Sequence, residues 1–185
     1  MKIHKIHRWK ISVKQAKELQ SQLSGRILQK SPFKSISEIK MIAACDIAYA
    51  SKGRTACAVC LVYSYPGLKL LEKKTLKKTF KKIFPYVPGY LSFREAPVLL
   101  ELFKKIKSAP DIILIDGQGL AHPRGLGLAS HLGLFLDMPV IGCAKSLLYG
   151  ETSDPPPGLK GGYTFIKDIS GSIIGMNLRT KMYKK

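Results

Sequence analysis

The sequence predicts an α/β fold in which a mixed β-sheet is flanked by helices, and two observations carry that prediction. Three strand-like runs follow one another at residues 39–50, 55–65 and 68–79, close enough in sequence to pair antiparallel. Beyond them, helical periodicity alternates with short apolar runs, which favours β-α-β units and parallel strands. At 185 residues the chain can bury a core, and we expect a single domain over residues 1–185.

The N-terminal elements are a helix followed by the three strands. Ser12 and Gln15 form a capping-box pattern, so we expect a helix to begin there. Pro66 and Gly67 separate the second strand from the third at the distance of a hairpin turn. The lysine pairs between residues 73 and 82 fit a strand or a helix equally well. The apolar face of the first helix consists of Val13, Ala16, Leu19, Leu23 and Ile27.

The rest of the chain alternates helices and strands. A loop with two prolines leads into a second helix, whose start we place at residues 94–96. An earlier start would put Pro97 where the helix needs an N–H. We then expect a buried strand at 111–116, a glycine-rich turn, a helix at 123–136, a strand at 139–143, and a hairpin of residues 163–167 and 173–178.

Charge is the unusual feature of the composition. Thirty-one Lys and Arg oppose 12 Asp and Glu, which gives a net charge of +19. Such an excess favours a polyanionic partner, nucleic acid above all, because each cation near a phosphate releases condensed counterions. A membrane surface is the other polyanion, and charge that serves only solubility is the third interpretation. We see no secretory signal and no apolar span, and we expect a cytoplasmic protein without a membrane partner.

The four cysteines indicate no metal or redox site. Cys57 and Cys60 form a C-x-x-C pattern, but within a strand their side chains point to opposite faces of the sheet. We expect the cysteines to be small buried apolar residues in a reducing compartment.

Three acidic residues stand out among the 12. Asp46 lies inside an apolar strand, Asp116 closes the strand at 111–116, and Glu95 stands where the second helix begins. Carboxylates from two neighbouring strands and a helix start form the oxygen ligand set that Mg²⁺ requires, completed by water and substrate phosphate. A metal ion there would activate a water molecule and neutralise charge on a phosphate.

Each acid also has a structural alternative. Asp46 could be a buried acid bonded to backbone or lysine, and Asp116 could simply begin a turn before Gly117. Glu95 could complete a capping box with Ser92, although Pro97 argues against that start of the helix.

The turn after Asp116 adds further candidates. Gly117 and Gly119 let the backbone approach a ligand closely. His122 could move a proton or bind a phosphate, and Lys145 follows a strand end, where α/β sheets bind ligands. A surface or core histidine and a solvated lysine remain equally open interpretations.

Longer strings carry a family resemblance: CDIAYA at 45–50, PYVPGYLSFREAP at 85–97, and IDGQGLAHPRGLGLASHLGLFLDMPVIGCAK at 115–145. In these segments the chain resembles the endonuclease V family. The resemblance implies a ribonuclease-H-like fold and Mg²⁺ dependence, with Mn²⁺ as a substitute. It also implies a repair endonuclease that nicks DNA or RNA at the second phosphodiester bond 3′ to hypoxanthine (inosine).

The resemblance also assigns roles to residues of this chain. Asp46 and Asp116 would hold the metal, and Glu95 would be the third catalytic carboxylate. His122 and Lys145 fall on further catalytic positions of the family. Tyr86 matches the wedge that fills the gap left by an extruded base, a role that suits an aromatic side chain. The other positions implied to contact nucleic acid are Pro85, Pro88, Gly89, Gly117 and Gly119.

Two departures from the family affect the prediction. Gln118 stands where the family has histidine, and glutamine cannot titrate. The family also continues past residues 178–180 with a strand and a helix, which we expect this shortened relative to lack. Two alternatives to a monomeric endonuclease therefore remain. One is a weak or inactive protein that binds inosine-containing strands, and the other is a basic RNA-binding protein without a catalytic site.

Overall fold

The computed structural model describes residues 1–181, so the last four residues of the expected domain, 182–185, lie outside the described part. The helices are α1 (Val13–Ser24), α2 (Leu91–Phe103) and α3 (Leu128–Leu136), with a short 3₁₀ helix at Ile36–Glu38. The strands are β1 (Met41–Ala50), β2 (Thr55–Ser64), β3 (Leu70–Thr79), β4 (Ile112–Ile115), β5 (Val140–Gly142), β6 (Tyr163–Lys167) and β7 (Ile173–Leu178).

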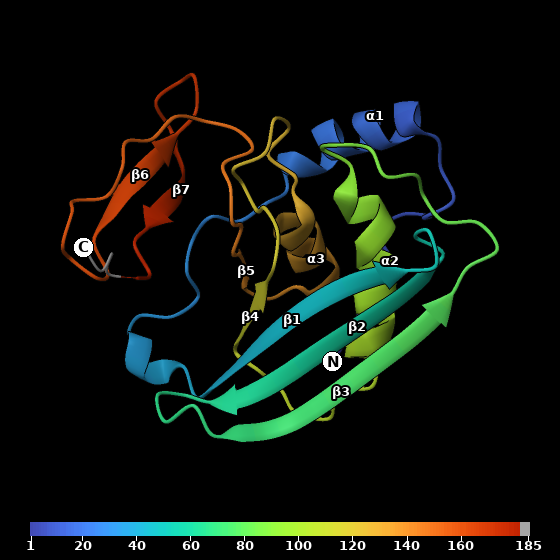
Figure 1. Cartoon of the computed structure of the whole chain (residues 1–185), viewed down its shortest axis with the longest axis horizontal. Coiled ribbons are helices and arrows are strands. Elements are labelled where there is room, and N and C mark those ends of the chain that lie inside the picture. Colours follow the sequence, from blue (N-terminus) through green and yellow to red (C-terminus); the bar gives the residue numbers. More distant parts are fainter. Residues whose placement is uncertain (182–185) are drawn as a thin grey trace.

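Five strands form one mixed sheet in the order β3-β2-β1-β4-β5 (Figure 1). β1, β2 and β3 are antiparallel, whereas β4 and β5 run parallel to β1. β6 and β7 form a separate antiparallel hairpin. The predicted mixed α/β sheet is therefore confirmed, and the parallel pairing places the carboxyl end of β4 beside the middle of β1.

The main core lies between one face of this sheet and helices α2 and α3. Alternate residues of the strands, such as Ala43, Cys45 and Ile113, point into it and are fully or nearly fully buried. Their neighbours Ile42 and Ala44, on the opposite face, remain partly exposed. The helices thus cover the sheet on one side and leave the other side, the open face, accessible among the described residues.

Helix α1 begins as predicted. The Ser12 hydroxyl accepts from the backbone N–H of Gln15, and the Gln15 side chain accepts from the Ser12 backbone, which completes the capping box. The buried residues of α1 are Ala16, Gln20 and Leu23, so a polar side chain lies within its inner face.

The predicted start of α2 was wrong. The helix begins at Leu91, so Glu95 lies inside it and Pro97 is a helical residue. Ser92 does not cap the helix; its hydroxyl is hydrogen-bonded to Nδ1 of His131 at 3.1 Å. The interaction with α3 fixes the first turn despite the N–H that Pro97 lacks. Helix α3 also differs from the prediction, because it begins at Leu128 and not at residue 123.

Aromatic residues of the N-terminal segment close one end of the helix pair. Trp9 stacks on Phe135 with 4.9 Å between ring centroids, and Nε2 of His7 lies 2.7 Å from Nε2 of His131. Burial lowers the pKa of His131 to about 3, so this ring is neutral. Aromatic residues of the basic N-terminal stretch therefore pack against the hydrophobic core.

The cysteine prediction was partly right. Cys57 is exposed and Cys60 is buried, so the two side chains do point to opposite faces of β2, and all four cysteines are free thiols. Cys143 is exposed as well, however, and only Cys45 and Cys60 are buried apolar residues. Across residues 1–181, no helix has the length and apolar character that crossing a bilayer requires.

Candidate active site

Asp46, in the middle of β1, and Asp116, directly after β4, stand side by side where the pairing of the two strands ends. Cys45 pairs in register with Ile115, and the backbone N–H of Asp116 donates to the Cys45 carbonyl at 3.3 Å. The next residues along both strands are the two aspartates, so their backbones are about 4.8 Å apart, the spacing of neighbouring strands. Asp46 is exposed, which makes the alternative of a buried structural acid wrong.

Glu95 brings a third carboxylate to the same place from α2. Its residue is only 7% exposed. Burial, followed by the charge of Asp46, raises the pKa of Glu95 to about 8; Arg94 opposes this shift and Asp116 adds to it. Because each of the two aspartates disfavours the negative charge on Glu95, the three acids share one electrostatic environment.

Lys145, in the segment after β5, already supplies a cation to this group. Its Nζ lies 2.6 Å from Oδ2 of Asp116, and this hydrogen bond raises the pKa of the lysine. The lysine side chain is 86% exposed. It can therefore turn away from Asp116 without leaving a buried charge behind.

A cavity of about 410 Å³ joins these groups. The side chains of Asp46, Glu95, Asp116 and Lys145 all line it. The other expected site residues that line it are Tyr86, Pro88, Gly89, Gly117 and His122. Pro85 and Gly119 do not line this cavity. The acids that the sequence singled out are thus gathered around one open space.

The donor set of this cavity fits a hard divalent cation. Within residues 1–181, no three His, Cys, Asp or Glu side chains form a ready cage for an ion. Mg²⁺ does not need one, because it keeps several waters and is usually held by one or two carboxylates with substrate phosphate. Asp46 and Asp116 supply such a pair, and Asp116 already attracts a cation in the form of Lys145.

His122 lies at the cavity wall, where its ring is hydrogen-bonded to backbone groups. It is 3% exposed, its Nε2 donates to the Gly89 carbonyl at 2.8 Å, and its Nδ1 accepts from the Arg124 backbone at 3.1 Å. Burial lowers the pKa of His122, which favours the neutral ring. In this arrangement both ring nitrogens of His122 are engaged by the protein, and its catalytic role stays a prediction.

Two further side chains bind the same carbonyl, and the sequence reasoning missed both. Gln20 Nε2 donates to the Gly89 oxygen at 3.0 Å, and Arg124 Nη2 donates to it at 2.9 Å. Arg124 Nε also donates to Oε1 of Gln20, at 2.7 Å. We call Gln20, His122 and Arg124 the Gly89 clamp. The only available signal was a glutamine within the apolar face of a helix.

The glycine turn after β4 packs tightly against β5. Gly117 has φ +148, a conformation that favours glycine, and a side chain on Gly142 would meet the Gly117 carbonyl at 2.5 Å. Gln118 donates from Nε2 to the Ser146 carbonyl at 2.7 Å. Gly142, which the sequence reasoning did not single out, therefore lets the turn and the Lys145 segment lie together.

Tyr86 projects from the loop between β3 and α2 and is 73% exposed. Arg94 holds this loop, because its guanidinium donates to the Phe84 carbonyl at 2.8 Å and to the Gly53 carbonyl at 2.9 Å. An aromatic ring is thus presented to solvent at the mouth of the cavity on an anchored loop.

Sequence comparison places these features in a known group of proteins. The family model described as Endonuclease V matches residues 21–185. An Endonuclease V from Roseiflexus sp. (strain RS-1) is 42% identical over 173 residues, which cover 94% of this chain and 74% of the relative.

Solved structures agree with the sequence match. The crystal structure of an Endonuclease V from Bacillus subtilis superposes with a TM-score of 0.88 at 32% identity, covering 100% of this chain and 78% of the other. A Ciona intestinalis Endonuclease V (D234N) in complex with a 23mer DNA containing an inosine followed by a ribo-adenosine has a TM-score of 0.65 at 33% identity. That match covers 75% of this chain and 60% of the other.

Proposed function

The chain belongs to the endonuclease V family, and we propose that it is a metal-dependent endonuclease acting on hypoxanthine (inosine) in DNA or RNA. The bond cut would be the second phosphodiester 3′ to that base. The observation that carries the proposal is the meeting of Asp46, Glu95 and Asp116 at one cavity in a protein of net charge +19.

In this proposal Asp46 and Asp116 hold Mg²⁺, or Mn²⁺ in its place. The ion, when bound, supplies an activated water and neutralises charge on the scissile phosphate. Glu95 faces the same cavity. A bound cation would favour the charged form of its carboxyl group, which could then accept the proton of the attacking water. Lys145 leaves Asp116 for the phosphate, where its ammonium group offsets the negative charge that builds up during cleavage.

The loop carrying Tyr86 would act on the base. A base taken out of a stack leaves a gap, and an aromatic side chain that fills this gap replaces the lost stacking. The backbone of Gly89 and Gly117 lines the adjoining cavity, where it can hydrogen-bond the edge of an extruded base. The Gly89 clamp would keep that backbone in place.

The decisive experiment compares the wild type with Asp46→Asn on labelled strands containing inosine or adenosine in Mg²⁺. We expect a discrete nick in the inosine strand only, and a loss of at least about 100-fold in the variant, the size of effect typical for an electrostatic catalytic group. Chelation of the metal should abolish cutting by the wild type.

The outcomes separate the candidate functions. Equal cutting by wild type and Asp46→Asn would refute the proposal. Inosine-dependent binding without any product, even in Mn²⁺, would favour the catalytically inactive inosine-binding protein. Binding that ignores the base would favour a general RNA-binding protein.

A further inference from the structure

The lysines of β3 are divided between the two faces of the sheet. On the face covered by helices, Lys74 forms an ion pair with Glu72 at 3.6 Å, and Lys78 forms one with Glu101 of α2. These two lysines are thus matched by carboxylates within the fold.

Lys73 and Lys77 alternate with them and point to the open face. Both are exposed, and within residues 1–181 neither has a carboxylate at ion-pair distance. Thr75 lies between them and pairs with Val59, which in turn pairs with Asp46. Residues paired in this way project from the same face, so the two free lysines share a face with Asp46. Two strand spacings, about 10 Å, separate Thr75 from Asp46.

The positive charge continues at the end of the sheet where the cavity lies. Lys81 and Lys82 follow β3 and are exposed. Lys52 and Arg54 occupy the turn between β1 and β2, and the Arg54 carbonyl accepts from the backbone of Phe80 at 2.9 Å. Arg94, which precedes Glu95 in α2, donates hydrogen bonds to the Gly53 carbonyl of this turn and to the Phe84 carbonyl of the loop that leads to Tyr86. These cations therefore lie in or next to segments that are held against the start of α2.

We propose that these residues form a phosphate-binding track, the β3 track, consisting of Lys52, Arg54, Lys73, Lys77, Lys81 and Lys82. It would hold the sugar-phosphate backbone of the nucleic acid beyond the cavity. Lys73 and Lys77 are four residues apart, about 13 Å, which corresponds to about four base steps of 3.4 Å. The proposal rests on the proposed function, because that function places a nucleic-acid strand in the adjoining cavity.

Its position favours nucleic acid over another polyanion. The track shares a face with Asp46 and leads to the loop of Tyr86, so a strand bound in the cavity would continue over it. An acidic protein or a membrane surface would not need a binding face that continues into this cavity. Within β3, the lysines of the covered face are paired with carboxylates, and those of the open face are not.

The test is the salt dependence of binding to a labelled inosine strand that extends beyond the cavity, measured in chelator so that no cutting occurs. For Lys73→Gln/Lys77→Gln we expect the slope of log affinity against log salt to fall by about 1.4 to 1.8, because two phosphate contacts are lost. The wild type should then lose about tenfold more affinity than the variant between about 50 and 200 mM salt.

The matched control is Lys74→Gln/Lys78→Gln, which removes the same charge from the same strand but from the covered face. It should keep the wild-type slope. If this control does not fold, Lys104→Gln/Lys105→Gln at the far end of α2 replaces it. Equal slopes for the Lys73/Lys77 variant and the wild type would overturn the track, as would an equal drop in the control.

Failure of the proposed function would be visible separately. A wild type that cuts no inosine strand and binds inosine and adenosine alike would refute that function, whereas the track concerns only the difference in slope between the two double variants.

Discussion

Asp46 and Asp116 directly follow Cys45 and Ile115, a registered pair of the parallel strands β1 and β4. The register of the two strands by itself therefore brings the two negative charges close together. Glu95 then reaches the same space from α2, where burial and the charge of Asp46 raise its pKa. A cation relieves this repulsion most directly, and Lys145 occupies that place on Asp116 in the structure.

Tyr86 offers a prediction at the same scale. Tyr86→Ala should weaken binding of an inosine strand by about 5- to 150-fold, because stacking of a base on an aromatic ring contributes about 1–3 kcal/mol. Tyr86→Phe keeps the ring and should stay near the wild type. The measurement is a titration with inosine and adenosine strands.

Equal loss in the Phe and Ala variants would contradict a wedge that acts through its ring. A loss that is the same for both strands would show that Tyr86 contacts the nucleic acid without replacing an extruded base.

At the scale of elements, the Gly89 clamp joins α1, the Tyr86 loop and the turn after β4. The Gly89 carbonyl accepts from Gln20, His122 and Arg124, which belong to segments far apart in the chain. The guanidinium of Arg124 also lies 4.4 Å from the ring centre of Tyr90. Three donors on one oxygen hold the loop in one position, and a loop that must insert a ring benefits from being held.

Gln20→Ala tests the clamp. Removing this buried partner should lower the free energy of unfolding by about 1–3 kcal/mol and raise the KM for an inosine strand. Ser12→Ala on the same helix removes the capping box and should cost about 1 kcal/mol of stability with no change in KM. Chemical denaturation and steady-state cleavage give the two quantities. A KM that rises equally in both variants would reduce Gln20 to a stability role.

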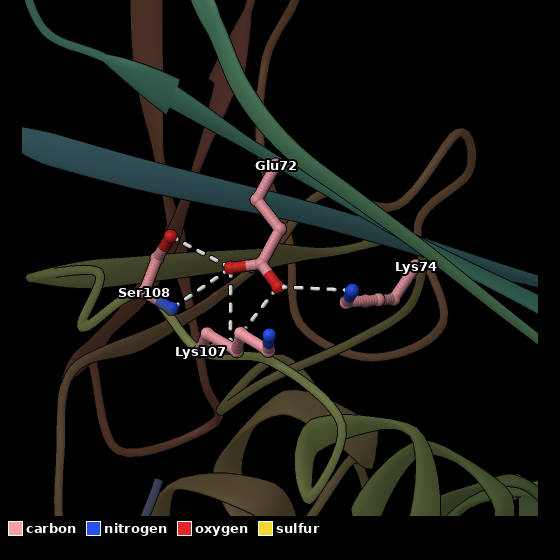
Figure 2. A network of polar contacts seen from close by, with 4 residues as sticks. All are labelled: Glu72, Lys74, Lys107 and Ser108. Atoms are coloured by element: carbon pink, nitrogen blue, oxygen red, sulfur yellow. Dashed lines mark hydrogen bonds and ion pairs between the residues drawn. The ribbon is translucent and has the colours of Figure 1, made fainter.

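A second junction ties the edge strand β3 to the loop after α2 (Figure 2). Both oxygens of Glu72 accept from the backbone of Lys107, and Oε2 also accepts from the backbone and hydroxyl of Ser108. The Ser108 hydroxyl, followed by these backbone groups, lowers the pKa of Glu72 to about 2. Lys74 adds a smaller charge contribution.

The stability contributed by Glu72 should therefore depend on pH. Its folded pKa of about 2 lies below the usual 4.5, so the contribution is complete above pH 4.5 and is lost as the pH falls toward 2. Unfolding of wild type and Glu72→Gln followed at several pH values should show a difference that is largest near neutrality and shrinks in this window. A difference independent of pH would contradict the assignment.

At the scale of the whole molecule, the two faces of the sheet differ in charge because helices cover only one of them. Acids on the covered face neutralise the lysines beside them, while the open face keeps its positive charge next to the carboxylates of the cavity. A cavity lined by acids within a cationic surface suits a phosphate backbone that must be attracted broadly and cut at one point.

The sequence alone determined the mixed sheet, the capped first helix and the terminal hairpin, and it singled out the three acids that line one cavity. These follow from local periodicity and from residue types that are costly in apolar surroundings. The family strings added the resemblance. The sequence did not determine the start of α2, the hydrogen bonds of His122, the participation of Gln20 and Arg124, or which lysines of β3 are free. Those features depend on hydrogen bonds and ion pairs between segments as far apart as residues 20 and 126, and only the folded chain brings such partners within bonding distance.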